Sequence, residues 1–273
     1  MKSYLNLLRR CISDGVRVPA RPVLASTGER PDCLSLFGAT LRHDLDDGFP
    51  LLTTKRVFWR GVVHELVWFL RGDTNVRYLH EHGVTIWDEW LPADGSGDLG
   101  PIYGKQWRDF GGVDQVRNVV ESLKALASDP HHPSRRRLVV SAWNPPDVPS
   151  MALPPCHTAF QALPVGHVLN LHVFCRSIDV FLGLPFNVAS YAALTHFLAA
   201  QAGLVPGVVQ WSITDLHLYT NHLDAAREQL SREPRPLPRL RVEPTATLDD
   251  VCADHFTLDG YAPCPAIKAE VAI

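Results

Sequence analysis

The alternating run Val168-Leu169-Asn170-Leu171-His172-Val173-Phe174 is the stretch from which the fold class of this chain can be inferred. Apolar and polar residues alternate in it, which is typical of a strand with one buried face. Residues 187–203 follow and are apolar for most of their length, with Ala and Leu dominant, so they predict a buried helix. Residues 208–213 predict a further strand.

Outward from this stretch, helical and strand patterns cover most of the chain. Helices are expected at residues 5–12 with an end near Gly15, 59–71, 113–127 and 218–230. Strands are expected at residues 34–38, 40–45 and 137–143, with short strands and turns after residue 240. Loops rich in turn-forming residues are expected at 17–33 and 91–113. This order predicts one α+β domain over residues 1–273, with helices packed against a sheet.

The composition is that of an ordinary globular protein, with 46% hydrophobic and 20% charged residues. A net charge of −3 gives no basic surface of the kind that nucleic-acid-binding proteins carry, so no nucleic-acid partner is expected. The six cysteines are scattered without a Cys-x-x-Cys pair, and no leader or membrane-spanning stretch is seen. Free thiols in the cytoplasm, and no membrane partner, are therefore expected.

Several motifs that would assign a chemistry are missing. The sequence has no G-x-G-x-x-G, no P-loop, no G-x-S-x-G and no H-E-x-x-H. Pro155-Cys156 resembles half of a zinc deaminase site, but the second ligand would fall at Ala159, which cannot bind a metal. No metal site is expected.

Cys156, in Leu153-Pro154-Pro155-Cys156-His157, is the candidate nucleophile. A cysteine near a strand is more often a small buried apolar residue. Basic residues in neighbouring segments, Arg135 to Arg137 and Arg176, would lower the pKa of the thiol and favour the thiolate, although an Arg triplet is equally typical of a solvated surface. Arg176 ends an apolar strand, where an anionic partner is expected because an unpaired buried charge is costly.

Three further features are candidates for a site. Glu65 lies among apolar residues of a helix, where a carboxyl group either pairs with a base or has a raised pKa suited to proton transfer. The alternation from Asp215 through His217 to Tyr219 places these side chains on one side of an extended stretch. Asn187 before a helix is usually an N-cap.

Long runs in this chain resemble the folate-dependent thymidylate synthase family over essentially the whole length. The matching runs are residues 47–56, 64–70, 84–90, 100–104, 141–144, 152–157, 176–187, 215–221, 230–236 and 271–273. The resemblance implies an α+β fold with a mixed sheet, a sheet-to-sheet homodimer, and reductive methylation of dUMP to dTMP by 5,10-methylenetetrahydrofolate.

The resemblance also implies roles for the reacting residues. Cys156 would add to C6 of the pyrimidine and Asn187 would hydrogen-bond the uracil edge, where an amide can both donate and accept. Glu65 would relay protons, assisted by Tyr103 and Asp179.

Binding roles follow from the same resemblance. The phosphate would be held by Arg176 and Ser177, with Arg136 and Arg137 of the partner subunit, and the sugar hydroxyl by His217 and Tyr219. Residues that would line the folate site are Trp87, Trp90, Leu153, Asp179, Gly183 and Phe186, with Ile273 closing over it.

One loop departs from the family pattern. Where the family has an Arg-Thr-Gly-Thr-Gly-Thr loop whose Arg clamps the phosphate, this chain has Gly28-Glu29-Arg30-Pro31-Asp32-Cys33, so the clamp falls to Arg30 or Arg21, or is missing. Glu29 and Asp32 add negative charge there. The alternatives are a specialised pyrimidine nucleotide hydroxymethylase or methylase acting on UMP, dUMP or dCMP, and a non-catalytic nucleotide-binding homologue.

Overall fold

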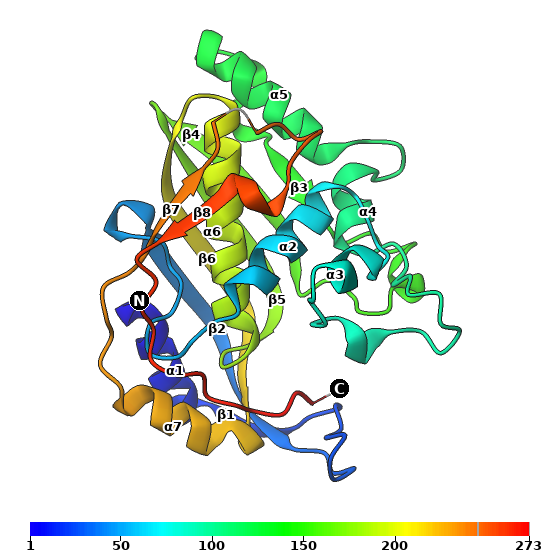
Figure 1. Ribbon diagram of the computed structural model, residues 1–273, viewed down its shortest axis with the longest axis vertical. Coiled ribbons are helices and arrows are strands. Elements are labelled where there is room, and N and C mark those ends of the chain that lie inside the picture. The colour runs from blue at the N-terminus through cyan, green and yellow to red at the C-terminus, as the bar shows by residue number, and fades with distance from the viewer. Residues whose placement is uncertain (245, 273) are drawn as a thin grey trace.

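The computed structural model describes residues 1–244 and 246–272 (Figure 1). Its α-helices are α1 (Lys2–Asp14), α2 (Trp59–Leu70), α3 (Arg77–Glu81), α4 (Tyr103–Arg108), α5 (Gln115–Ser128), α6 (Gly183–Gln201) and α7 (Leu223–Ser231). Its strands are β1 (Val16–Pro19), β2 (Asp32–Asp44), β3 (Val139–Ser141), β4 (His157–Val165), β5 (Val168–Asp179), β6 (Val205–Tyr219), β7 (Arg239–Val242) and β8 (Phe256–Asp259). Short 3-10 helices are η1 (Leu45–Asp47), η2 (Asp88–Trp90), η3 (Pro133–Arg136), η4 (Val148–Ser150), η5 (Thr220–His222) and η6 (Ala253–His255).

Six strands form one mixed sheet in the order β1-β2-β6-β5-β4-β3, and β7 pairs with β8 in a separate hairpin. Only β5 and β6 pair in parallel among the described strands, and α6 makes the connection between them. β4 and β5 are joined by the two-residue turn Gly166–His167, where Gly166 has a φ of 60°, which the first position of such a hairpin turn favours. The mixed α+β fold expected from the sequence is confirmed.

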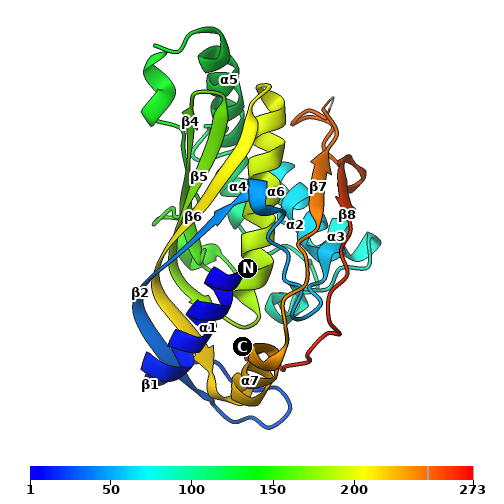
Figure 2. The same cartoon turned by 90° about the vertical axis from the view of Figure 1, so that its left-hand side faces the viewer.

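Helix α6 forms the centre of the core. It lies along one face of the sheet, between the sheet and α2, as Figure 2 shows. Its residues are apolar nearly all round, which is the pattern of a helix buried on every side. Phe197 and Leu194 have no exposed surface. The helix holds the ends of β5 and β6 in place, and these strand ends carry most of the candidate site.

The opposite face of the sheet is open, and no helix covers β2, β5 and β6 there within the described residues (Figure 2). Large apolar side chains point out from it. Phe37 on β2 is 86% exposed and Phe174 on β5 is 38% exposed. An apolar surface of this kind is typical of a protein–protein contact.

The sequence predicted the type of most elements better than their bounds. The helices expected at 59–71 and 113–127 are confirmed as α2 and α5. The strands expected at 34–38 and 40–45 are one continuous strand, β2, and the strand at 208–213 is the centre of the longer β6.

Four expectations were wrong. The helix expected at 218–230 begins only at Leu223, as α7, because residues 218 and 219 still belong to β6. The loop expected at 17–33 includes most of β1, which pairs with β2 from Val16↔Ser35 to Pro19↔Asp32. The turn-rich segment 91–113 contains the short helix α4, and α6 begins at Gly183 rather than at Asn187. β1 forms through pairing with the distant strand β2, whereas the start of α6 depends on the turn that Asp179 caps.

None of the helices in the described residues is both long enough and apolar enough to cross a membrane.

Candidate active site

Cys156 lies just before β4 and is half-buried. Its backbone N–H donates to the hydroxyl of Tyr103 at 2.8 Å, and its carbonyl accepts from the backbone N–H of Arg176 at 2.8 Å. Two prolines precede it, and each has a fixed φ and no N–H to pair. The backbone of Cys156 is therefore fixed by hydrogen bonds at both its N–H and its carbonyl group.

The guanidinium of Arg176, near the end of β5, folds back over the segment that carries the thiol. Its Nη2 lies 3.9 Å from Cys156 Sγ and donates to the carbonyl of Pro154 at 3.0 Å. Its Nε donates to the carbonyl of Pro155 at 2.9 Å. The guanidinium of Arg176, which contacts the thiol, is thus oriented by three acceptors of one short segment.

Burial raises the pKa of the Cys156 thiol, and the charge of Arg176 only partly opposes it. The sequence-based expectation that the pKa of Cys156 is lowered is therefore wrong for the protein without a bound substrate. Arg176 does act in the predicted direction. Arg136 and Arg137 are not among the charges that act on the thiol, and they lie at η3 and its C-cap.

Glu65 lies in the middle of α2 with 7% of its surface exposed. Its Oε1 accepts a hydrogen bond from Trp87 Nε1 at 2.8 Å. Burial raises the pKa of Glu65 to about 8, against the opposing effect of the Trp87 hydrogen bond. The carboxyl group is therefore largely protonated at neutral pH, as expected for a group that transfers protons near pH 7.

Tyr103, the first residue of α4, connects these two residues. Its ring stacks on that of His157 at 4.2 Å between centroids and lies edge-on to Trp87 at 6.4 Å. Burial raises the pKa of Tyr103 well above its usual value, so the hydroxyl stays protonated. Cys156, Tyr103, Trp87 and Glu65 thus form a continuous chain of contacts.

A hydrogen-bonded cluster lies at the ends of β5 and β6. The carboxylate of Asp215 accepts from the hydroxyls of Ser35 at 2.6 Å and Ser177 at 2.8 Å. His217 Nδ1 lies 3.1 Å from the same carboxylate. The hydrogen bond with His217, followed by those with the two serines, lowers the pKa of Asp215 well below its usual value.

The ring of Tyr219 lies edge-on to that of His217, with 5.2 Å between their centroids. The sequence placed Asp215, His217 and Tyr219 on one side of an extended stretch, and the structure agrees. Burial, then the charges of Asp179, Cys33 and Cys156, raise the pKa of Tyr219 to about 12. Tyr219 thus adjoins His217 at the edge of this cluster.

Asn187 is inside α6, and the N-cap of that helix is Leu182. The N-cap role considered for Asn187 is therefore wrong. Its half-exposed side chain makes no hydrogen bond with any residue of the described part of the chain, so the amide is free to meet a ligand.

Asp179 caps the turn between β5 and α6. It accepts from the backbone N–H groups of Phe181 at 2.8 Å and Leu182 at 3.2 Å. This turn sets where α6 begins, and so where Asn187 lies.

The side chains expected to line a folate site differ in exposure. Trp87 is buried, whereas Trp90, Leu153 and Phe186 are partly buried against the core. The rings of Trp87 and Trp90 meet edge to face, with centroids 5.7 Å apart. A Cβ at Gly183 would contact only Ile178, at 3.5 Å, so the backbone of this glycine stays approachable. These flat, partly exposed apolar groups fit a folate ring system.

Three predicted arginines do not join the site within this chain. Arg136 and Arg137 are exposed at η3, where the Arg136 carbonyl accepts from Gln161 Nε2 at 3.1 Å. Gln161 is five residues along β4 from Cys156, roughly 16 Å of strand.

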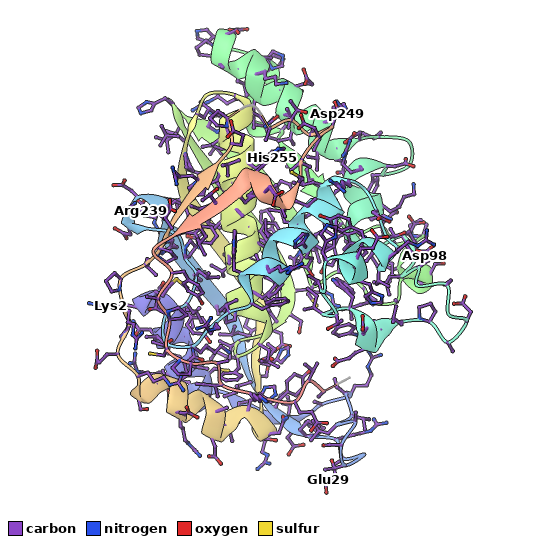
Figure 3. All side chains as sticks on the ribbon, viewed as in Figure 1. Lys2, Glu29, Asp98, Arg239, Asp249 and His255 are labelled. Atoms are coloured by element: carbon purple, nitrogen blue, oxygen red, sulfur yellow. The ribbon has the colours of Figure 1, made fainter. Side chains whose placement is uncertain are left out.

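Arg30 is exposed in the loop before β2, beside Glu29, which Figure 3 shows at the outer tip of that loop. Asp32 forms an ion pair with Arg17 at 2.7 Å, so its negative charge is partly compensated.

Two residues near the site were missed from the sequence. Lys55 is buried, donates to the carbonyl of Phe181 and lies 3.5 Å from the centre of the Phe181 ring, and burial lowers its pKa to about 8. His222 is buried with its Nδ1 3.8 Å from Asp179. A buried lysine has no local sequence signal, because only the fold shows what surrounds it.

The C-terminal segment returns to the site. The carboxylate of Glu270 accepts from the backbone N–H of Ser26 at 2.8 Å, and its carbonyl lies 2.7 Å from His222 Nε2. Ala272 forms a bridge with Leu24. Ile273, expected to close over the folate, lies outside the described residues.

A cysteine thiol beside a guanidinium, linked through Tyr103 and Trp87 to a buried carboxyl group, is an arrangement that suits enzymes with a cysteine nucleophile. The thymidylate synthase family model matches residues 2–273, and the chain belongs to this family. The family methylates dUMP with methylenetetrahydrofolate, and the chain is accordingly assigned as a methyltransferase. Within residues 1–244 and 246–272, no His, Cys, Asp and Glu side chains cluster as a metal site would require.

Proposed function

We propose that this protein converts dUMP to dTMP, with methylenetetrahydrofolate supplying both the one-carbon unit and the hydride. The observation that carries the proposal is the Cys156 thiol held 3.9 Å from the Arg176 guanidinium, in a chain of this family. Cys156 adds to C6 of the uracil ring, which makes C5 a carbon nucleophile.

The thiol needs a stronger positive field than it has in the free chain, since burial raises its pKa. Arg176 already favours the thiolate. Arg136 and Arg137 of the partner subunit would add positive charge at this site, and a substrate phosphate would bind Arg176 through a charged fork. Asn187, whose amide is free within the described residues, would read the uracil edge.

Glu65 is proposed to hold and move the proton exchanged at the ring. Its raised pKa keeps the carboxyl protonated near neutral pH, so that it can both donate and recover a proton. Tyr103 would position Cys156 through the hydrogen bond from the Cys156 N–H, and Asp179 would fix the turn before α6.

Ser177 is proposed to bind the phosphate beside Arg176, with His217 and Tyr219 binding the sugar. The hydroxyl of Ser177 and the ring of His217 are already oriented by Asp215, so little freedom is lost on binding. Arg30 stays a candidate for the loop phosphate contact.

The folate is proposed to lie against Trp87, Trp90, Leu153, Gly183 and Phe186. The partly exposed rings of Trp90 and Phe186 offer flat apolar surfaces to a folate, and a bound folate would exclude water from them. Ile273 is proposed to complete that exclusion.

The protein is proposed to be a cytoplasmic homodimer that pairs through the open sheet face. The exposed Phe37 and Phe174 support this, because such side chains are seldom left in water. Arg136 and Arg137 have no side-chain partner among the described residues and lie far from their own Cys156. They would reach the phosphate site of the partner subunit.

The test is incubation with dUMP and methylenetetrahydrofolate, following dihydrofolate absorbance and the mass of the nucleotide. The proposal requires dihydrofolate to form together with dTMP. A hydroxymethylated nucleotide without dihydrofolate would instead support the hydroxymethylase alternative, with UMP and dCMP as parallel substrates. Inactivity with all three nucleotides would favour a binding protein.

A further inference from the structure

A cavity of about 570 Å³ lies on the outer side of α2, where α2, α3 and the segment 252–256 meet. Figure 1 shows α3 next to α2, and His255, labelled in Figure 3, lies within the segment 252–256. No candidate active-site residue lines this cavity. Its volume is in the range of small-molecule sites.

One wall of the cavity is a cluster of three aromatic rings that are tilted against one another. The His64 and His82 rings have centroids 4.4 Å apart at 35°, and the Tyr78 and His82 rings 4.5 Å apart at 42°. His64 Nδ1 lies 3.1 Å from the Tyr78 hydroxyl. Burial, followed by the charges of His82 and Arg60, lowers the pKa of His64 to about 4, so this ring is neutral at pH 7. A planar ligand can stack on such a wall.

Two arginines stand on the same face of α2 as His64, four residues before it and seven after it. Arg71 lies 4.9 Å over the Tyr78 ring and donates to the carbonyl of Val251. Arg60 makes no ion pair or hydrogen bond with any residue in 1–244 or 246–272. Its guanidinium is therefore available to an anion.

Acceptors complete the lining. The carboxylates of Glu81 and Asp254 lie at the exposed edge of the cavity. These carboxylates can accept hydrogen bonds from the N–H groups of a heterocyclic ring. A ligand that carries only an anionic group would have no such donors for them. The lining thus combines a stacking wall, a free guanidinium and acceptors.

We propose that this cavity is a second small-molecule site, for a planar nitrogen heterocycle that carries an anionic group. The ring stacks on His82 and Tyr78, its N–H groups face Asp254 and Glu81, and its anion pairs with Arg60. Pyrimidine nucleotides and folates share this chemistry. The site does not depend on the activity proposed for Cys156.

Cys252 provides a readout confined to this cavity, because its half-buried thiol lines it. The protein is alkylated with iodoacetamide in the presence of dTMP or of folic acid, and each cysteine peptide is quantified by mass spectrometry. At a probe concentration about ten times the Kd, alkylation of Cys252 should slow about tenfold, since only the free fraction reacts. Cys264, half-buried outside the cavity, should keep its rate.

Protection by dTMP alone assigns the site to nucleotides, and protection by folic acid alone assigns it to folates. The Arg60→Ala variant should lose the protection, whereas Arg77→Ala, an exposed α3 arginine outside the lining, should retain it. The proposal is overturned if neither probe protects Cys252 up to ~10 mM. Equal protection in Arg60→Ala and the unaltered protein would overturn it as well.

Discussion

At the residue scale, burial and a single guanidinium act in opposite directions on the Cys156 thiol. Arg176→Gln removes the charge that opposes the effect of burial, so the pKa of Cys156 should rise further. The pH dependence of Cys156 alkylation in the free protein measures this shift. Arg42→Gln, an exposed change on β2, is the control and should leave the profile unchanged. An unshifted profile in Arg176→Gln would contradict the role given to this arginine.

The buried carboxyl of Glu65 makes a prediction about stability. It keeps its proton up to about pH 8 in the folded chain, whereas the unfolded chain releases it near pH 4.5. Between these values each pH unit should cost the folded state about 1.4 kcal/mol, so stability falls as pH rises. In the Glu65→Gln variant, the side chain at position 65 is an amide, which does not titrate in this pH range.

The Glu65→Gln variant should therefore show a flatter dependence of the free energy of unfolding on pH. Urea unfolding of both proteins between pH 5 and pH 8 is the measurement. Parallel curves would show that Glu65 is not held protonated in the folded state.

At the element scale, α6 carries both the core and Asn187. Phe197→Ala leaves a cavity under the sheet, where the side chain has no exposed surface, and should cost about 3–5 kcal/mol. Phe58→Ala is a matched control, since that ring is 47% exposed, and should cost about 1 kcal/mol or less. Similar losses for the two variants, measured by denaturant unfolding, would contradict the central place of α6.

The start of α6 also shows where sequence reasoning stops. Periodicity predicted a buried helix here, because apolar residues on all sides leave no other structure favourable. It did not predict the start at Gly183, which depends on the carboxylate of Asp179 capping the turn. Asn187 consequently lies one turn after the start of α6, and its amide makes no hydrogen bond with the described residues.

Pairing between distant strands explains the other differences. Most of β1 was expected as loop because residues 17–33 are rich in Pro, Gly, Arg and Thr, and the strand forms through its pairing with β2. The candidate site was predicted in part: the motifs gave Cys156, Glu65 and Arg176. The Trp87–Glu65 hydrogen bond and buried Lys55 require the folded chain.

At the scale of the whole molecule, the proposed dimer makes each site depend on two chains. Cys156→Ala lacks the nucleophile, and a variant with Arg136→Ala and Arg137→Ala lacks the proposed partner contacts. Each alone should be nearly inactive. After unfolding and refolding together in equal amounts, about a quarter of the sites should be complete, because mixed dimers contain one intact site.

Recovery of activity in the refolded mixture, with unmixed variants refolded in parallel as controls, checks this arrangement. No recovery from a mixture shown to contain mixed dimers would mean that Arg136 and Arg137 do not act across the interface.

The most direct test of the central claim is tritium release from dUMP labelled at C5, in the presence of methylenetetrahydrofolate. Release requires that the thiol has added to C6 and that the C5 proton has then been removed. The account predicts steady release by the unaltered protein and none above background by Cys156→Ala, although that variant should still bind dUMP. Release by Cys156→Ala at the unaltered rate would contradict the account.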